Sequence, residues 1–233
     1  MNNHLDHLVV LAPTLEVGVD WCEQLLGLTP GPGGKHPLMG THNRLLSLAN
    51  TNYPSLYMEI LAIDPDAEFN QVESRGRWFG LSNSALQKFL NNQGPQLFHA
   101  VVRVEDLSEK LLRAHSIGLD PGRILQAQRQ TSKGILEWEI LVRDDGQLLF
   151  NGCLPTLIKW GKEHPQSNMV DEGVYLKKIA LSHPKPGELG QTFKRFDLSL
   201  PLSDGLAQWK IELMSPRGLV YLSSPDLSQF FTV

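Results

Sequence analysis

The feature that most constrains the fold of this chain is an internal repeat. The run LDHLVV around His7 recurs as LFHAVV around His99, 92 residues later. A second motif follows each run at nearly the same offset, LGLTPG at residues 26–31 and IGLDPG at residues 117–122. Two short matches in the same order at one offset favour duplication of a structural unit over chance similarity.

The first copy is predicted to begin with a strand and a helix. Residues 5–12 form an apolar run typical of a strand, and Thr14 is a candidate N-cap for a helix that ends at Gly27. Turns rich in glycine and proline follow, and the next strand-like runs lie at about residues 43–49 and 55–63. This order indicates a βαβββ unit.

The second copy shows the same succession of signals. Residues 97–104 predict a strand, Asp106 and Glu109 have the spacing of a capping box, and Gly118 is expected to end the helix. The strands expected after that helix lie at about residues 123–130, 135–143 and 147–160. Both copies are therefore interpreted as βαβββ.

The predicted fold class is α+β, with paired βαβββ modules and a partial third module at the C-terminus. The expected segments are a first module (1–63), an inserted loop with a short helix (64–95), a second module (96–161) and the partial third module (174–233). The first strand of that third segment carries Lys178 where the other two copies carry a histidine.

Composition and charge restrict the class of function. The 233 residues include 21 Lys and Arg against 25 Asp and Glu, which argues against nucleic acid as a partner because phosphate binding needs a basic face. The sequence has no run of about 18 apolar residues and no basic signal-peptide region, so we expect no membrane association. Two cysteines cannot form a disulfide framework, and a cytoplasmic location is expected.

Three side chains form a candidate metal site. Glu59 interrupts an apolar strand-like run, and a carboxylate buried there needs a partner, a metal or water. If the two modules pack as pseudo-symmetric halves, His7 and His99 approach one another, with Glu59 in the same half as His7. Two imidazoles and a carboxylate suit Fe(II), Mn(II), Ni(II) or Zn(II) and leave positions for a substrate. The alternative is that the histidines are packed or surface residues and the glutamate is solvated.

These units, with a histidine on the first strand and a glutamate on the fourth, resemble the vicinal oxygen chelate superfamily. That superfamily includes glyoxalase I, extradiol dioxygenases, fosfomycin-resistance enzymes and bleomycin-binding proteins. More narrowly, four segments are similar to the glyoxalase-like domain family. They are LDHLVVLAP, GGKHPLMGTHNRLLSL (33–48), YMEILAIDPD (57–66) and RWFGLS (77–82).

The resemblance implies that His7, Glu59 and His99 are ligands of a divalent ion, which is Zn, Ni, Mn or Fe. Such an ion binds two neighbouring substrate oxygens and acts as a Lewis acid as negative charge develops on them. Glu59 could instead serve as the catalytic base if it is displaced from the metal.

The second glutamate of glyoxalase I has no obvious match. The repeat offset leads to Phe150 or Asn151, and alignment of strand ends leads to residues 153–157, none of which is a carboxylate. Glu137 and Glu139 would substitute only if the strands are counted differently. The departure argues against glyoxalase I activity, while a three-ligand site stays compatible with other members.

On the same resemblance, His42 and Asn43 are expected to bind substrate at the mouth of the sheet. The alternative is a β-hairpin whose polar side chains satisfy backbone groups. In the inserted loop, Arg77, Trp78 and Phe79 could form a lid over an apolar or anionic substrate, or could anchor the loop on the core.

The function predicted from the sequence is a metal-dependent lyase, isomerase or dioxygenase of the vicinal oxygen chelate type. Its substrate is expected to be a small organic molecule bound between the modules. The alternative is a protein that sequesters a small molecule without catalysis, as bleomycin-resistance proteins do. A homodimer is possible by analogy with the superfamily.

Overall fold

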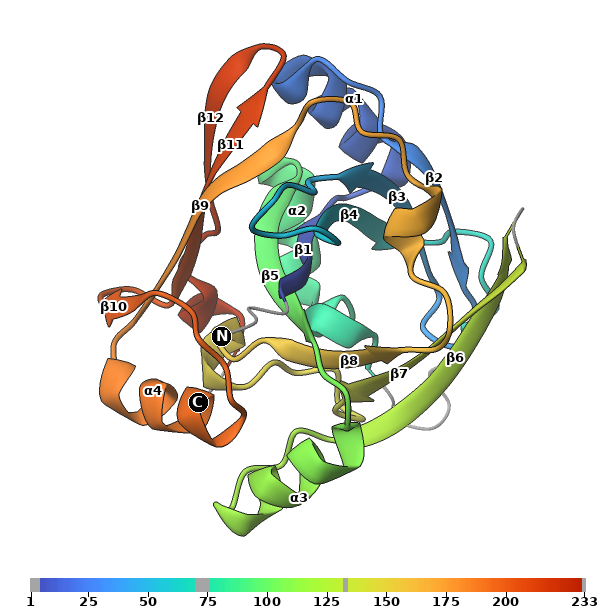
Figure 1. Cartoon of the computed structure of the whole chain (residues 1–233). Helices are drawn as coiled ribbons and strands as arrows, with labels where there is room; N and C mark the ends of the chain where they lie inside the picture. The colour runs from blue at the N-terminus through green and yellow to red at the C-terminus, as the bar shows by residue number, and fades with distance from the viewer. Residues whose placement is uncertain (1–4, 70–75, 132–133, 232–233) are drawn as a thin grey trace.

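The computed structural model describes residues 5–69, 76–131 and 134–231, and the element order βαβββ occurs in it three times (Figure 1). The first unit comprises β1 (Leu5–Leu11), α1 (Leu15–Leu26), β2 (Gly31–His36), β3 (Thr41–Ser47) and β4 (Tyr57–Ile63). The second comprises β5 (Gln96–Arg103), α3 (Leu107–Ser116), β6 (Arg123–Thr131), β7 (Gly134–Val142) and β8 (Thr156–Trp160). The third comprises β9 (Tyr175–His183), α4 (Pro186–Arg195), β10 (Leu202–Asp204), β11 (Gln208–Ser215) and β12 (Gly218–Ser223).

The helix boundaries predicted from capping signals are confirmed. The Thr14 hydroxyl accepts a hydrogen bond from the Val17 backbone N–H, and Gly27 ends α1 in the left-handed conformation with φ 80°. The Asp106 carboxylate accepts from the Glu109 N–H at the start of α3. No helix in the described parts of the chain is long and apolar enough to cross a membrane.

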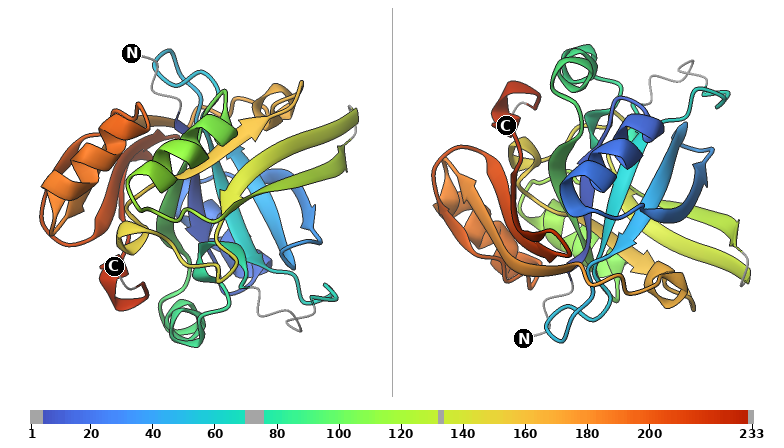
Figure 2. Two further views of the ribbon diagram at one scale, coloured as in Figure 1. Left: turned by 90° about the horizontal axis from the view of Figure 1, so that it is seen from below. Right: turned by 90° about the horizontal axis from the view of Figure 1, so that it is seen from above.

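The first two units share one eight-stranded sheet. Its strand order is β2-β3-β4-β1-β5-β8-β7-β6, so the two first strands, β1 and β5, pair antiparallel at the seam. Each first strand also pairs parallel with the fourth strand of its own unit. The sheet curls until its two edge strands, β2 and β6, contact one another (Figure 2). A concave interior between the two units results.

The C-terminal unit has the same order of elements but different strand pairing. Its separate sheet has the order β10-β9-β11-β12, so β9 lies between β10 and β11 and does not pair with β12. Strands β11 and β12 contact β5, and Figure 1 shows this orange-to-red unit beside the central strands. The third unit therefore extends the molecule and does not enlarge the curled sheet.

The connection between β7 and β8 differs from the strand predicted at residues 147–160. Only Thr156–Trp160 is extended, and the preceding residues contain the short 3-10 turn η3 (Phe150–Gly152). Asn151 has φ 52° and Gly152 has φ 82°, two consecutive left-handed residues that turn the chain away from the extended conformation of a strand. In the inserted segment, the 3-10 turn η2 (Trp78–Gly80) precedes α2 (Ser84–Gln93), which is the short helix expected between residues 64 and 95.

Candidate active site

A small cavity lies in the interior of the curled sheet, between the two modules. Its volume is about 30 Å³, enough for about two water molecules. One wall is polar and comes from the first module, and the other is mainly aromatic and aliphatic. The lining residues are His7, His36, Asn43, Leu45, Tyr57, Glu59, Trp78, Phe79, Arg129, Leu136, Trp138, Ile140, Ile158, Trp160 and Pro165.

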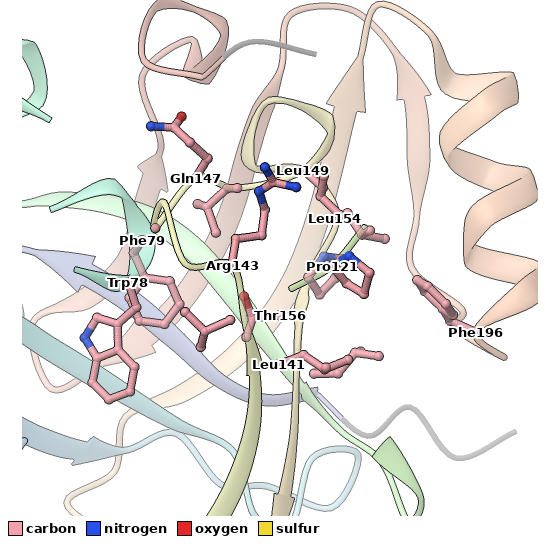
Figure 3. Close-up of a pocket in the computed structure, with 15 residues that line it drawn as sticks. Trp78, Phe79, Pro121, Leu141, Arg143, Gln147, Leu149, Leu154, Thr156 and Phe196 are labelled. Atoms are coloured by element: carbon pink, nitrogen blue, oxygen red, sulfur yellow. The ribbon is translucent and has the colours of Figure 1, made fainter. Parts of the chain in front are cut away.

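A second cavity, of about 40 Å³, lies beside the second module (Figure 3). Trp78 and Phe79 line both cavities and therefore stand between them. Most of the other side chains that line the second cavity are aliphatic. Its one charged lining residue among those described is Arg143, which is already paired with Asp145 at 2.7 Å. The second cavity therefore offers packing space, and the acid–base groups lie in the first.

Asp6 and His7 lie at a β-bulge in β1. Strand β1 sets His7 opposite Val101 and Leu5 opposite Val102, so Asp6 is an extra residue in the ladder. Its Oδ1 lies 2.7 Å from His7 Nδ1. Because an ionised carboxylate can only accept, Nδ1 carries the hydrogen and His7 Nε2 is left facing the cavity.

The buried Asp6 carboxylate is held by three donors. Burial alone would raise its pKa, but hydrogen bonds from His164 and His7 outweigh burial and lower the pKa to about 2. His164 Nε2 lies 3.0 Å from Oδ2, and the Trp160 indole N–H donates to the same oxygen at 2.9 Å. Asp6 is therefore ionised and fixed, and it orients the His7 ring.

Glu59 is fixed by Asn43. The Asn43 amide donates to Glu59 Oε1 at 2.6 Å, while its own oxygen accepts from the Gly34 backbone N–H at 2.8 Å. The other carboxylate oxygen, Oε2, lies 3.6 Å from His7 Nε2, too far for a direct hydrogen bond. The Tyr57 ring stacks on the His7 imidazole with centroids 4.7 Å apart. Nε2 of His7 and Oε2 of Glu59 therefore face one small space.

His36 supports this arrangement as a neutral ring. Burial, with the Arg129 cation adding to it, lowers the pKa of His36 to about 3. Its Nε2 can then accept from the Asn43 amide at 3.3 Å, and its Nδ1–H can donate to Thr41 Oγ1 at 3.1 Å. The Trp78 indole N–H donates to the same hydroxyl at 3.2 Å, so the inserted loop is attached to this network.

Arg129 reaches the cavity from β6, the edge strand of the second module. Its guanidinium lies 3.4 Å from Asn43 Oδ1 in the first module, across the open side of the curled sheet. Burial lowers its pKa, and the nearby Glu59 and Tyr57 act in the opposite direction. The sequence gives no sign of this role, because it depends on contact between two edge strands far apart in the chain.

The second half of the site is built differently. Thr156 corresponds to Glu59, because Val9, two residues after His7, pairs with Glu59, and Val101, two residues after His99, pairs with Thr156. Thr156 lies within the 153–157 range predicted from strand ends. Glu137 and Glu139 lie on β7, where Glu139 pairs with Lys159.

His99 is fully buried and both its ring nitrogens are engaged. Nδ1 lies 2.9 Å from the Gly152 carbonyl, and Nε2 accepts from the Thr156 backbone N–H at 3.1 Å. Burial lowers the pKa of His99 to about 3, so the ring is neutral. The Gly152 carbonyl also accepts from the Trp209 indole N–H at 3.0 Å, which joins the C-terminal unit to this half-site.

The residues do not fit the expected three-ligand metal centre. His7 Nε2 and Glu59 Oε2 lie close together, but His99 has no nitrogen free to join them. Within residues 5–69, 76–131 and 134–231, no three His, Cys, Asp or Glu side chains form a group that could hold a metal ion.

The remaining predicted site residues divide between the cavity and the outside. Asn43, Trp78 and Phe79 line the cavity, whereas His42 does not, because it alternates to the opposite face of β3.

Arg77 does not line the cavity. It lies over the Phe69 ring at 4.2 Å. Trp78 and Phe79 are buried, so they anchor the inserted loop on the core while forming part of the cavity wall. Five further residues of the site were not predicted from the sequence, namely Asp6, His36, Tyr57, Arg129 and His164. Adjacency to His7 was the available signal for Asp6.

Comparisons with known proteins agree on the fold. A sequence model described as a glyoxalase-like domain matches residues 5–196. A hypothetical protein from Staphylococcus aureus is similar in structure, with TM-score 0.56, 15% identity and coverage of 94% of this chain and 84% of that one. No protein of curated function matches.

Methylmalonyl-CoA epimerases are more distant structural neighbours. The Mycobacterium tuberculosis enzyme has TM-score 0.39 and 16% identity, covering 71% of this chain and 91% of its own. A Streptomyces coelicolor epimerase variant has TM-score 0.43 and 15% identity, covering 70% and 99%. Similarity at this level carries no argument about activity. The match to the family model, however, spans most of the sequence and both modules, and the chain belongs to the glyoxalase-like domain family.

Proposed function

We propose that the chain is an enzyme of the vicinal oxygen chelate type that moves a proton on a small, oxygenated organic substrate, as an isomerase or a lyase. The observation that carries the proposal is the Asp6–His7 pair directed at Glu59 inside the cavity. A carboxylate that holds the far nitrogen of an imidazole fixes the tautomer and makes the near nitrogen a better base.

His7 is the proposed general base. Its Nε2 takes a proton from a carbon next to a carbonyl group, the C–H electron pair moves into the carbon skeleton, and the carbonyl oxygen becomes an enolate oxygen. The proton then returns to the substrate, on the same or another atom. Asp6, ionised and held by three donors, stabilises the imidazolium that forms in between.

Glu59 is the proposed second proton-transfer group. Asn43 occupies its Oε1, which leaves Oε2 beside His7 Nε2 at 3.6 Å. An isomerase that removes a proton at one atom and delivers one to another can use two such groups around one substrate, one as the base and the other as the acid. A lyase would use one of them to protonate the leaving group.

The divalent ion expected from the superfamily finds two donors here, His7 Nε2 and Glu59 Oε2, and His99 lacks a free nitrogen. The steps above involve only side chains of this chain. Activity that survives a strong chelator is therefore expected.

The test is solvent-deuterium exchange, followed by proton NMR in D2O with EDTA present, on a panel of small 2-oxo and 2-hydroxy acids and their neutral esters. Wild-type protein is expected to exchange at least one member. We expect His7→Asn and Glu59→Gln to slow exchange by about a hundredfold or more. His42→Asn, on the opposite face of β3, is the matched control. Exchange that is absent throughout, or unchanged in His7→Asn, would overturn the proposal.

Sequestration of a small molecule is the second candidate. The observation in its favour is the pairing of His99 with Thr156, which leaves the site with one carboxylate and one available imidazole. This function predicts ligands that raise the melting temperature but undergo no exchange, and it predicts that Glu59→Gln binds them as tightly as wild type.

A further inference from the structure

We propose that Arg129 binds two neighbouring oxygens of the substrate, and that the substrate is therefore a small oxyanion such as a 2-oxo or 2-hydroxy carboxylate. The inference rests on the proposed function for the placement of the reacting carbon beside His7 and Glu59. It does not need that function for anion binding itself. Three observations support anion binding: the unbonded N–H donors of Arg129, its position beside the cavity, and the room for its side chain at Gly34.

The hydrogen-bonding capacity of Arg129 is largely unused. A guanidinium presents five N–H donors in a planar fork. In the described residues, the hydrogen bond formed by Arg129 is the 3.4 Å contact with Asn43 Oδ1, and the group has no carboxylate within 4 Å. Buried or half-buried charges are ordinarily paired, because leaving them unpaired is costly. Arg129 lines the same cavity as His7 and Glu59, so its remaining donors are available to a molecule bound there.

The first module leaves room for this guanidinium. Gly34 on β2 faces Arg129 across the gap between the edge strands, and a Cβ added at Gly34 would collide with Arg129 Nη1. The glycine thus permits a long side chain from β6 to reach the polar wall of the opposite module. Such an arrangement holds the cation where the edge strands β2 and β6 meet, within reach of a substrate bound between the two modules.

Arg129 also lies where a substrate would enter. An outer groove of about 580 Å³ runs between the edge strands and the segment that follows β8. Four residues line both this groove and the inner cavity, namely Leu45, Arg129, Leu136 and Pro165. Arg129 is the charged member of this neck. An anion that enters from the groove meets the guanidinium before it reaches His7.

The planar fork matches two oxygens attached to one carbon or to adjacent carbons. In a 2-oxo acid these are a carboxylate oxygen and the neighbouring carbonyl oxygen. The fork would stabilise the negative charge that collects on that carbonyl oxygen when the adjacent C–H bond breaks and the proton moves to His7. In this site a guanidinium would fill the oxygen-binding role that the superfamily assigns to a metal ion.

The test uses oxalate as the probe, with inorganic phosphate as a tetrahedral comparison, in calorimetric titrations with EDTA present. We expect wild type to bind oxalate more tightly than phosphate. Arg129→Met is expected to weaken oxalate binding by about ten- to a hundredfold, and Arg129→Lys by less. The matched control is Arg123→Met, because Arg123 lies on the same strand but is exposed and pairs with Asp144. Ethylguanidinium is expected to restore binding to an Arg129→Ala variant.

Thermal melting of each variant checks the fold. Oxalate binding that is absent in wild type, or equal in Arg129→Met and wild type, would overturn the inference. The two proposals fail separately. If oxalate binding depends on Arg129 but no substrate exchanges deuterium, the proposed catalysis is wrong and the anion site is supported. If Arg129→Met still catalyses exchange with an unchanged KM, the proposed catalysis is supported and the anion site is wrong.

Discussion

Thr156 holds in the second module the position that Glu59 holds in the first. Both residues lie on the fourth strand of their unit, opposite the residue two positions after a first-strand histidine. Glu59 Oε2 lies 3.6 Å from His7 Nε2, and Thr156 Oγ1 lies 3.0 Å from His99 Nε2. The neutral threonine lets its module bury the histidine with both nitrogens bonded, whereas the glutamate keeps its half of the site polar.

The first prediction follows from this substitution. In Thr156→Glu, a second carboxylate would compete for His99 Nε2 and complete the set of four side chains expected from glyoxalase I. We expect added Zn(II) or Ni(II) to raise the melting temperature of this variant by several degrees more than that of wild type. Differential scanning fluorimetry with metal and with EDTA measures the difference. Equal shifts in both proteins would show that Thr156 does not limit metal binding.

The second prediction concerns acid stability. Burial lowers the pKa of both His36 and His99 from 6.5 to about 3. Between these values the unfolded chain binds protons that the folded chain does not, so stability is full above pH 6.5 and falls as the pH drops toward 3. His99→Gln removes one of these two titrating groups. Between pH 6.5 and 3, the unfolding free energy of the variant should therefore fall by about 1.4 kcal/mol less per pH unit than that of wild type.

Urea unfolding at intervals of half a pH unit provides that measurement. His115→Gln is the control, because this side chain lies on the exposed surface of α3. A pH dependence in His99→Gln identical to that of wild type would mean that His99 is not held neutral by burial.

The third prediction separates two adjacent glycines. A Cβ at Gly33 would collide with the backbone carbonyl of Asn43, whereas a Cβ at Gly34 would meet the end of the Arg129 side chain. Backbone cannot move as easily as a flexible side chain, so Gly33→Ala should destabilise the fold by about 2–3 kcal/mol. Gly34→Ala should cost less than about 1 kcal/mol and should weaken oxalate binding by moving Arg129. Denaturant unfolding and oxalate titration of both variants check this, and a stable Gly34→Ala with normal oxalate affinity is the contrary result.

The fourth prediction concerns the segment after β8. His164 Nε2 donates to Asp6, and Gln166 on the same 3-10 turn, η4 (Pro165–Asn168), donates to Ser47 Oγ at 2.8 Å. We expect His164→Ala to lower kcat with little change in KM, because Asp6 then holds His7 less firmly. It should also lower stability by about 1–2 kcal/mol.

His164→Gln is the conservative partner, because its amide can donate to Asp6 from a similar position. Recovery of kcat in His164→Gln separates orientation of Asp6 from simple loss of packing. Equal defects in both variants would assign His164 a packing role only.

The internal repeat made the order of strands and helices predictable from the sequence, but not the contacts between the two modules. Strand and helix positions follow from local apolar patterns and caps, such as Thr14 and Asp106, which each copy carries in its own sequence. The pairing of His7 with Glu59 follows from strand alternation within one module. These features depend on residues close together in the chain or on one sheet register.

The engagement of His99 and the position of Arg129 depend on other information. The Gly152 carbonyl reaches His99 because the chain turns through left-handed conformations at Asn151 and Gly152, which the apolar pattern of residues 147–160 does not reveal. Arg129 reaches Asn43 only when the sheet closes on itself. The sequence therefore brought out His7, Asn43 and Glu59 as candidates, and it missed the groups that hold them, the cation and the closure of the other half.

The hydrogen bond from Trp209 to the Gly152 carbonyl gives the second-module histidine a link to the C-terminal unit. The same carbonyl oxygen lies 2.9 Å from His99 Nδ1, so one acceptor holds both the second-module histidine and a tryptophan of the C-terminal unit. A change at Trp209 can therefore reach the His99 ring through a single shared atom. The two copies of the repeat thus differ in their surroundings, because His7 borders the cavity and His99 borders the C-terminal unit.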